Sequence, residues 1–379
     1  MQLLLSPSSQ LIAHGQGRPS TFNFQFATHP SSGCLLLLPK SDHGLLEAVR
    51  DAQHKEPEAH LALAAKMIDE ARDGSKGQPT AAQVIGLTDK DLSLVNLVSQ
   101  CFGSDRANKV LMPGSHPLEA QKLVSERRVG AKIAPGTILV ARHLLEHARD
   151  LDSFLGGLWF ITGEEGTCLI EVPECGKLLK QGDLTQLWEE HCAYFTRATL
   201  HAALHHSGFE ILSSRVTESD GEPLCLTLVK RAPSKQTRHN NLPIERSAER
   251  FLSELPCQIR HIKRRLGKLN KQSTVLLFGA NHVAGLFVDV LEEAASHIDA
   301  ILDDDPGKHG CTLGLAQIPV KAPREVERSK PTCILVAVSE GRAPELYDRL
   351  RTMFPKTAGH QLHSLTNFCV ENRGNAFEH

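Results

Sequence analysis

The sequence of 379 residues has no Cys-x-x-Cys pair, no excess of either charge and no long apolar run. Its ten cysteines are scattered, and most lie in apolar segments. This predicts free buried thiols in a reducing compartment rather than a disulfide framework. Lys and Arg total 42 against 44 Asp and Glu, so there is no basic stripe and we expect no nucleic-acid partner.

Signals for secretion or membrane insertion are also missing. The first residues, MQLLLSPSSQ, lack a basic region followed by a long apolar core. The longest apolar runs, such as GCLLLLP and TVLLFGA, are too short to cross a bilayer. We therefore expect a cytoplasmic protein without a membrane partner.

Strand and helix signals alternate along most of the chain. Hydrophobic residues make up 41% of the chain, and its length of 379 residues suits two or three domains. Buried strands are predicted at 81–88, 108–114, 136–143 and 166–173, with helices between them, which favours a parallel sheet covered on both faces. A polar linker at 232–243 precedes a helix over 244–269 and a second α/β unit. The predicted parts are an irregular arm at 1–60, an α/β domain at 61–232 and a C-terminal α/β domain at 233–379.

Four motifs occur in one order: ARHLLEHARDLDSFL (141–155), EVPECGKLL (171–179), EEHCAYFTRATLHAALHHSGFEI (189–211), and a segment with Asp-x-x-Pro-x-Lys-x-Gly followed by Ile-Pro (275–323). Together they resemble the S-adenosylmethionine-dependent C-methyltransferases that act on nucleotide-linked keto-sugars. The resemblance covers roughly residues 80–379. It implies an α/β fold with a Rossmann-like class I methyltransferase domain followed by a second, smaller α/β C-terminal domain.

The resemblance implies that Glu190 and His191 form the base that removes a proton next to a ketone, with Tyr194 as a further polar group. The chemistry is suitable, because the ordinary pKa of histidine lies near neutrality. The alternative is that His191 is an ordinary helix histidine, one of 20 in the chain. Where the family carries a tyrosine three residues earlier, this chain has Trp188, which cannot accept a hydrogen bond.

S-adenosylmethionine is the cofactor that the resemblance implies, with Thr88, Asp91, Arg142 and His143 as its candidate ligands. Gly279, His282 and Lys308 are the candidates for binding a nucleotide-sugar-like substrate. Gly279 begins a strand-to-helix turn that either approaches a phosphate or allows close strand–helix packing. His282 either serves the anion or only starts the helix.

The cofactor loop departs from the family pattern. In VIGLTDKDLSL (84–94), Gly86 stands where an acid belongs, and Thr88 and Leu92 replace glycines. Met112 ends the next strand where an acid should accept the ribose hydroxyls. Losing a charged acceptor costs about 1.5–3 kcal/mol, and a side chain forced into a glycine conformation costs about 1–2 kcal/mol. Since micromolar binding corresponds to only about 8 kcal/mol, we expect an affinity near millimolar.

The family's N-terminal zinc module is altered in the same way. THPSSGCLLLLP (28–39) has His29 and Ser32 where cysteines belong, so four zinc ligands are not available and no metal is expected.

Three functions stay open from the sequence. They are methyl transfer to a sugar nucleotide or related intermediate, cofactor-free epimerisation or tautomerisation of a keto-sugar, and a non-catalytic role as a nucleotide-binding partner protein.

Overall fold

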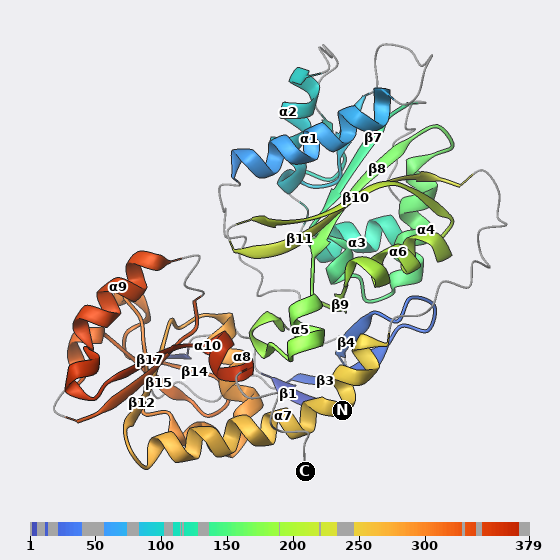
Figure 1. Ribbon diagram of the computed structural model, residues 1–379. Coiled ribbons are helices and arrows are strands. Elements are labelled where there is room, and N and C mark those ends of the chain that lie inside the picture. Colours follow the sequence, from blue (N-terminus) through green and yellow to red (C-terminus); the bar gives the residue numbers. More distant parts are fainter. Residues whose placement is uncertain are drawn as a thin grey trace.

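A computed structural model describes residues 2–5, 12–13, 22–39, 57–73, 83–101, 109–113, 115, 117–127, 136–188, 190–219, 221–232, 246–327, 330–338 and 343–370. Two α/β domains lie side by side, with a small sheet and a short helix between them (Figure 1). The predicted fold class is therefore confirmed. The predicted linker at 232–243 lies outside the described residues except for Ala232.

The methyltransferase-like domain has one mixed sheet with the strand order β10-β11-β8-β7-β5-β6. Strands β6, β5, β7 and β8 run parallel, with β6 at one edge, and β11 and β10 add an antiparallel hairpin at the other edge. The strands are β5 (Val84–Gly86), β6 (Lys109–Val110), β7 (Ile138–Arg142), β8 (Thr167–Pro173), β10 (Phe209–Ser219) and β11 (Glu222–Arg231). All four parallel strands lie within the segments that the sequence predicted.

Helices cover both faces of this sheet. Apolar residues of α1 and α2 fill one core, and those of α3, α4 and α6 fill the other. The helices are α1 (Glu58–Asp73), α2 (Leu92–Cys101), α3 (Pro117–Ser125), α4 (Leu151–Thr162) and α6 (Arg197–His206). Helix α1 begins directly after Pro57, which fits the N-terminal edge of a helix but not its interior.

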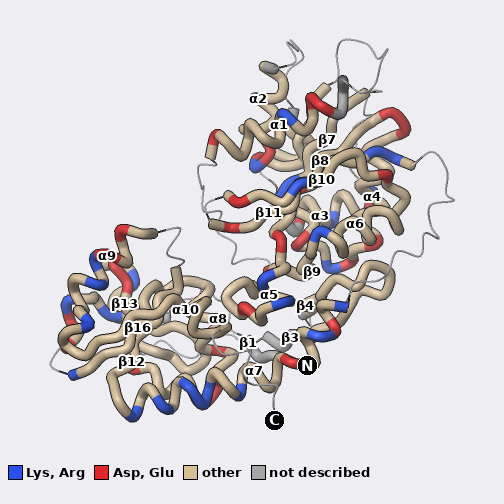
Figure 2. Tube along the Cα trace, in the orientation of Figure 1, with Lys and Arg blue, Asp and Glu red and all other residues tan. Residues whose placement is uncertain are grey.

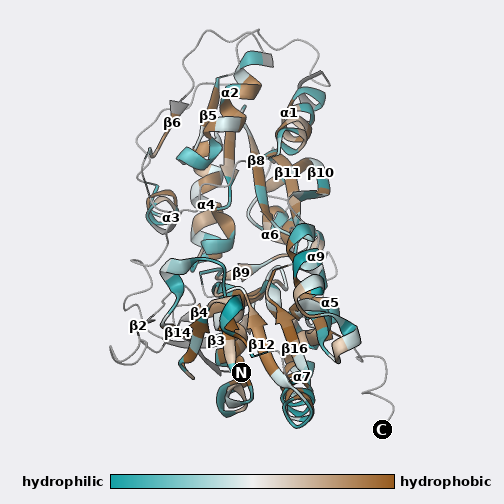
Figure 3. Ribbon diagram, turned by 90° about the vertical axis from the view of Figure 1, so that its left-hand side faces the viewer, coloured by the Kyte–Doolittle hydropathy of each residue, from teal (hydrophilic) through white to brown (hydrophobic). Residues whose placement is uncertain are grey.

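The C-terminal domain has the strand order β17-β16-β12-β13-β15-β14-β2, and its first five strands are parallel. The strands are β12 (Thr274–Phe278), β13 (Ala300–Leu302), β14 (Cys311–Leu313), β15 (Ile318–Lys321), β16 (Thr332–Val336), β17 (Gln361–Ser364) and β2 (Ile12–Ala13). The helices are α7 (Ser247–Asn270), α8 (His282–Leu291), α9 (Pro344–Met353) and α10 (Leu365–Val370). Hydrophobic strands lie inside both domains (Figure 3).

The sequence predicted an irregular N-terminal arm. Its described residues instead form strands of a sheet with the order β1-β3-β4-β9. Its strands are β1 (Gln2–Leu5), β3 (Phe22–Thr28), β4 (Leu35–Pro39) and β9 (Ala193–Tyr194). The reason is the alternation of apolar and polar residues in FNFQFAT. Phe26, Leu35 and Leu37 join the core of the C-terminal domain, whereas Leu36 joins the methyltransferase-like domain. The arm therefore connects the two domains.

Charges of both signs are spread over the two domains, and basic residues recur along α7 (Figure 2). Among the described helices, none combines the length and the apolar character that a membrane span requires.

Candidate active site

The candidate site lies at the carboxyl end of β7, next to that of β5. The connections leave these two neighbouring strands in opposite directions, and ligands of open α/β sheets bind in the crevice at such a point. Strand β7 ends at Arg142, and His143 takes a left-handed conformation with φ of 51°. A 3-10 turn, η3 (Leu145–His147), follows at once. The RHLLEH motif therefore places two pairs of adjacent polar residues, Arg142–His143 and Glu146–His147, at one sheet edge.

A buried carboxylate, Glu171 of β8, organises the first pair. Its Oε1 accepts hydrogen bonds from Arg142 Nη2 and His143 Nε2, both at 2.9 Å. Its Oε2 lies 2.8 Å from His60 Nε2, on helix α1. Burial alone would raise the pKa of Glu171, but the bonds from His143 and His60 and the charge of Arg142 hold it well below its ordinary value. Glu171 is therefore an ionised anchor at the centre of the network.

Glu146 continues this network toward the crevice. Its Oε1 lies 3.5 Å from His143 Nδ1. Burial opposes both charges, yet hydrogen bonding to Glu146 and Glu171 raises the pKa of His143 to about 10. Burial would likewise raise the pKa of Glu146, but the bond to His143 and the nearby histidines lower it to about 2. Glu146 is therefore ionised, and His143 protonated, at neutral pH.

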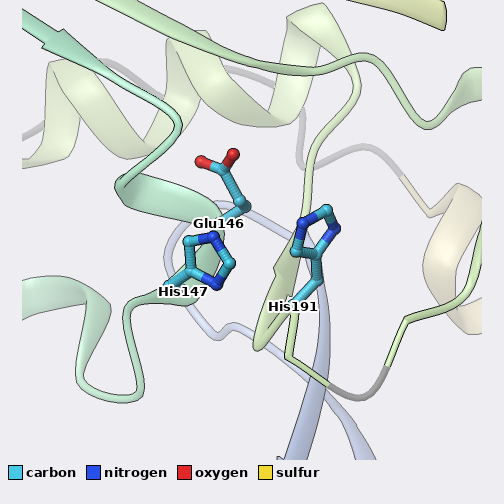
Figure 4. Close-up of side chains that lie close together, drawn as sticks. All are labelled: Glu146, His147 and His191. Carbon is cyan, nitrogen blue, oxygen red and sulfur yellow. The ribbon is translucent and has the colours of Figure 1, made fainter. Parts of the chain in front are cut away.

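Two imidazoles lie next to Glu146: His147 on the same turn and His191 in the loop before β9 (Figure 4). Their ring centroids are 5.0 Å apart. Nδ1 of His147 lies 2.9 Å from the backbone oxygen of Glu190, which can only accept, so Nδ1 carries the proton and Nε2 keeps a lone pair. Burial lowers the pKa of His147 and, together with the neighbouring His147, lowers that of His191 to about 3. Both imidazoles are therefore neutral.

The other two predicted catalytic residues hold this loop. The side chain of Glu190 is buried, and its carbonyl orients His147. The hydroxyl of Tyr194 donates to the carbonyl of Trp188 at 2.7 Å and accepts from the Trp188 amide at 3.0 Å. These contacts make Tyr194 a positioning residue for the segment that carries His191, and a catalytic role for it stays a prediction.

The predicted cofactor loop is closed by its own carboxylate. Asp91 Oδ2 accepts from the amides of Leu87, at 2.8 Å, and Thr88, at 2.9 Å. Burial raises the pKa of Asp91 to about 7. A Cβ on Gly86 would lie 2.6 Å from Asp91 Cβ, so Gly86 makes room for this acid. Two backbone amides of the loop are thereby occupied.

The expected glycine-type strain at Thr88 is absent, because this residue is extended, with φ of −127° and ψ of 173°. That part of the expected loss of affinity was wrong. Met112, by contrast, is buried in the core, as a side chain without a charged acceptor would be. Arg142 and His143 direct their side chains to Glu171, and their role in binding a cofactor stays a prediction.

The candidates in the C-terminal domain follow β12. Gly279, with φ of 99°, takes a conformation that favours glycine, and it begins the turn into α8. Lys308 Nζ donates to the Ala280 carbonyl and to Asp303 Oδ2, both at 3.0 Å, and so braces this turn. His282 stacks on Trp188, with ring centroids 5.0 Å apart and an interplanar angle of 29°. His282 thus joins the loop of His191, whereas Gly279 and Lys308 shape the turn beside it.

The sequence prediction missed Glu146, His147, Glu171 and His60 as members of the site. The first two lie inside the motif ARHLLEHARD, whose paired Glu-His was a usable signal. Glu171 follows a run of apolar residues in β8, and an acid within a buried strand was a second signal. His60 has no signal in the sequence.

At the altered zinc module, hydrogen bonds hold the hairpin between β3 and β4. His29 Nδ1 lies 3.0 Å from the Ser32 hydroxyl, and the His29 amide donates to the Cys34 carbonyl at 2.9 Å. Burial raises the pKa of the Cys34 thiol to about 12. A His–Ser bond thus spans the turn where the family has two cysteines; the expected absence of zinc stays a prediction.

Comparisons with solved structures give only weak similarity. A mitomycin 7-O-methyltransferase is 18% identical, with a TM-score of 0.29 over 46% of this chain and 54% of that chain. An O-methyltransferase from neocarzinostatin biosynthesis, in complex with S-adenosylmethionine, is 13% identical, with a TM-score of 0.27 over 46% and 57%. The magnesium protoporphyrin IX methyltransferase of Synechocystis PCC 6803, with bound S-adenosylhomocysteine, is 13% identical, with a TM-score of 0.30 over 46% and 84%.

This chain thus spans only about half the length of the first two proteins, 54% and 57%. Similarities of this size add nothing to the fold assignment, and no curated protein matches the sequence. Family models are more informative. Residues 81–214 match a methyltransferase domain, and residues 246–346 match a C-methyltransferase C-terminal domain. The chain is therefore methyltransferase-like, built as a Rossmann-like methyltransferase domain followed by a C-terminal domain of the C-methyltransferase type.

Proposed function

We propose that this chain removes a proton from a carbon next to a carbonyl group, in a nucleotide-linked keto-sugar or a related intermediate. The observation that carries the proposal is the pair of neutral imidazoles, His147 and His191, against the ionised Glu146. A base must be unprotonated before it reacts, and burial keeps both imidazoles in that form.

Glu146 supplies what a neutral imidazole lacks. When an imidazole takes the proton from carbon, it becomes a cation within a few ångströms of this carboxylate. At an effective dielectric constant of about 20, opposite charges about 4 Å apart attract by about 4 kcal/mol. That attraction raises the pKa of both histidines and so offsets part of the desolvation, although burial and His147 still hold the pKa of His191 at about 3. The bond from His147 to the Glu190 carbonyl keeps its Nε2 available as the acceptor.

The keto-sugar assignment rests on chemistry and on the second domain. Proton removal next to a ketone is the step that C-methylation, epimerisation and tautomerisation share. The C-terminal domain matches the C-methyltransferase type, and its residue His282 contacts the loop of His191 through Trp188. A substrate bound on the turn at Gly279 would therefore reach toward the imidazole pair.

Methyl transfer from S-adenosylmethionine is the second candidate, favoured by the two family models. The loop after β5 does not fit this cofactor in the way the resemblance implies. Its amides at Leu87 and Thr88 already bond to Asp91, and Met112 offers no acceptor for the ribose hydroxyls. Since the glycine-type strain at Thr88 is absent, the expected loss of affinity is smaller than the sequence predicted. We expect calorimetric titration to give a dissociation constant for S-adenosylmethionine at least about tenfold weaker than micromolar, because the missing charged acceptor alone costs about 1.5–3 kcal/mol. A low micromolar value would restore methyl transfer as the main function.

Deuterium uptake tests the proposal directly. Each member of a panel of nucleoside-diphosphate-linked keto-sugars is incubated with the protein in D2O, and exchange at the carbons next to the ketone is followed by NMR. His191→Ala should slow exchange by about 10²–10⁴-fold, whereas His206→Ala, on the exposed surface of α6, should not change it. Exchange that is equally fast in His191→Ala refutes the proposal. No exchange with any sugar, together with retained nucleotide binding, would favour a non-catalytic binding protein.

A further inference from the structure

Three side chains of the site form a compact set of metal-type ligands. Glu146, His147 and His191 each offer one ligand atom, and these atoms all lie within 4.8 Å of one another. The set comes from two segments, η3 and the loop before β9, and all three side chains are buried. Figure 4 shows Glu146 above His147, with His191 to their right. Burial distinguishes this set from the exposed acidic groups that are common on protein surfaces.

Glu146 carries an unsatisfied oxygen. The residue is only 2% exposed, and its Oε2 has no hydrogen-bond partner among the described residues. Its Oε1, in contrast, faces His143. Leaving a charged acceptor buried without a partner costs more than leaving a neutral one, so each such atom in a folded protein needs an explanation. A cation at this oxygen would supply one.

His147 is oriented as metal-bound histidines are. Such histidines donate the second ring nitrogen to a carbonyl or carboxylate, which fixes the tautomer and the ring plane. Here the Glu190 carbonyl accepts a hydrogen bond from Nδ1–H of His147 at 2.9 Å. The Nε2 lone pair is therefore the ligand that His147 has to offer. Glu146 has its own outer partner in His143, so two of the three ligands are held from behind.

We propose that Glu146, His147 and His191 bind a divalent transition-metal ion of the zinc type, and that this ion blocks proton transfer at the site. Two imidazoles and one carboxylate are a ligand set that zinc accepts while keeping a position for water. The blocking follows from valence: a lone pair bound to a metal cannot also accept a proton. The metal-free protein is then the form that removes protons from carbon, and the zinc form is inactive.

Cobalt(II) tests the site without any substrate, because its visible spectrum reports the ligands. Titration of cobalt into the chelator-treated full-length protein should give bands of four- or five-coordinate nitrogen and oxygen ligation, which zinc then displaces. Glu146→Gln and His191→Ala should each weaken zinc binding by at least the roughly 100-fold that loss of an outer-shell partner can cost. His206→Ala is the matched control and should bind as the wild type does.

Two results would overturn the metal site. One is equal zinc affinity in the wild type, Glu146→Gln and His191→Ala. The other is a thiolate-to-cobalt charge-transfer band that disappears in Cys34→Ser, which would place the ion at the altered hairpin of the arm. The wild-type spectrum decides between these ligand types even if a variant does not fold, and circular dichroism identifies such a variant.

Failure of this inference and failure of the proposed function give different results. If the site binds zinc, titration of zinc into the metal-free protein should stop deuterium exchange with the same dissociation constant that the competition against cobalt gives. Cobalt bands without exchange in the metal-free protein would leave the metal site standing and refute the proton-transfer function. Exchange that zinc does not affect would refute the block, and with it the assignment of the ion to the imidazole pair.

Discussion

Replacing Glu171 by Gln should destabilise the methyltransferase-like domain strongly. This carboxylate holds Arg142 and His143, at 2.9 Å each, and His60 at 2.8 Å. A glutamine keeps the size of the side chain but leaves the buried guanidinium of Arg142 without its counter-charge. Breaking a buried pair in this way costs about 3–5 kcal/mol. We expect a loss of that size in the free energy of unfolding.

A matched control is Glu210→Gln in the same domain. Glu210 pairs with Lys230 at 3.3 Å, but the two side chains are 45% and 42% exposed, so the expected loss is about 0–1 kcal/mol. Urea unfolding can be followed by tryptophan fluorescence in a Trp188→Phe background, where Trp159 of α4 is the remaining reporter. The reasoning is refuted if Glu171→Gln and Glu210→Gln differ by less than about 1 kcal/mol.

Three further predictions concern neighbouring residues. The native state keeps the His143 proton up to a pKa of about 10, whereas the unfolded chain releases it near 6.5. The free energy of unfolding should therefore fall as the pH rises between these values, by up to about 1.4 kcal/mol per pH unit. His143→Gln should flatten this slope, measured by urea unfolding from pH 7 to 9. Gly86→Ala puts a Cβ 2.6 Å from Asp91 Cβ and should lower the free energy of unfolding by about 1–3 kcal/mol, measured by thermal unfolding. Gly156→Ala, whose Cβ would have nothing within 4 Å, is the control and should be neutral or stabilising. Equal effects of the two substitutions would contradict the packing argument. Tyr194→Phe removes a hydroxyl that makes two hydrogen bonds to the loop before His191, and should lower the free energy of unfolding by about 1–3 kcal/mol. Deuterium exchange should slow but persist. Complete loss of exchange in a folded variant would make this tyrosine catalytic.

The parts of the fold that depend on local pattern could be predicted from the sequence. Apolar runs bounded by turn residues located β7 and β8, and the predicted helix over 244–269 corresponds to α7 (Ser247–Asn270). The two-domain α/β plan followed from the alternation of these elements. Strand β6, predicted over 108–114, is reduced to Lys109–Val110, because strand ends depend on pairing partners more than on composition.

The sequence by itself also determined which ionisable residues lie together in one part of the site. His143, Glu146 and His147 lie within one short motif directly after a strand. A single turn therefore brings them to the same sheet edge, independently of contacts with the rest of the chain. The same holds for Gly86 and Asp91, whose separation of five residues already allows a loop closed by its own acid.

Only the tertiary structure decided which of these groups carry charge. Glu171 meets His60 across 111 residues of sequence, and Trp188 meets His282 of the other domain. Hydrogen bonding and charge then separate the pKa of Glu146, about 2, from that of His143, about 10, against the effect of burial. Burial keeps His191 neutral. Ionisation depends on desolvation and on partners that lie close in space, and neither is written in the local order of residues.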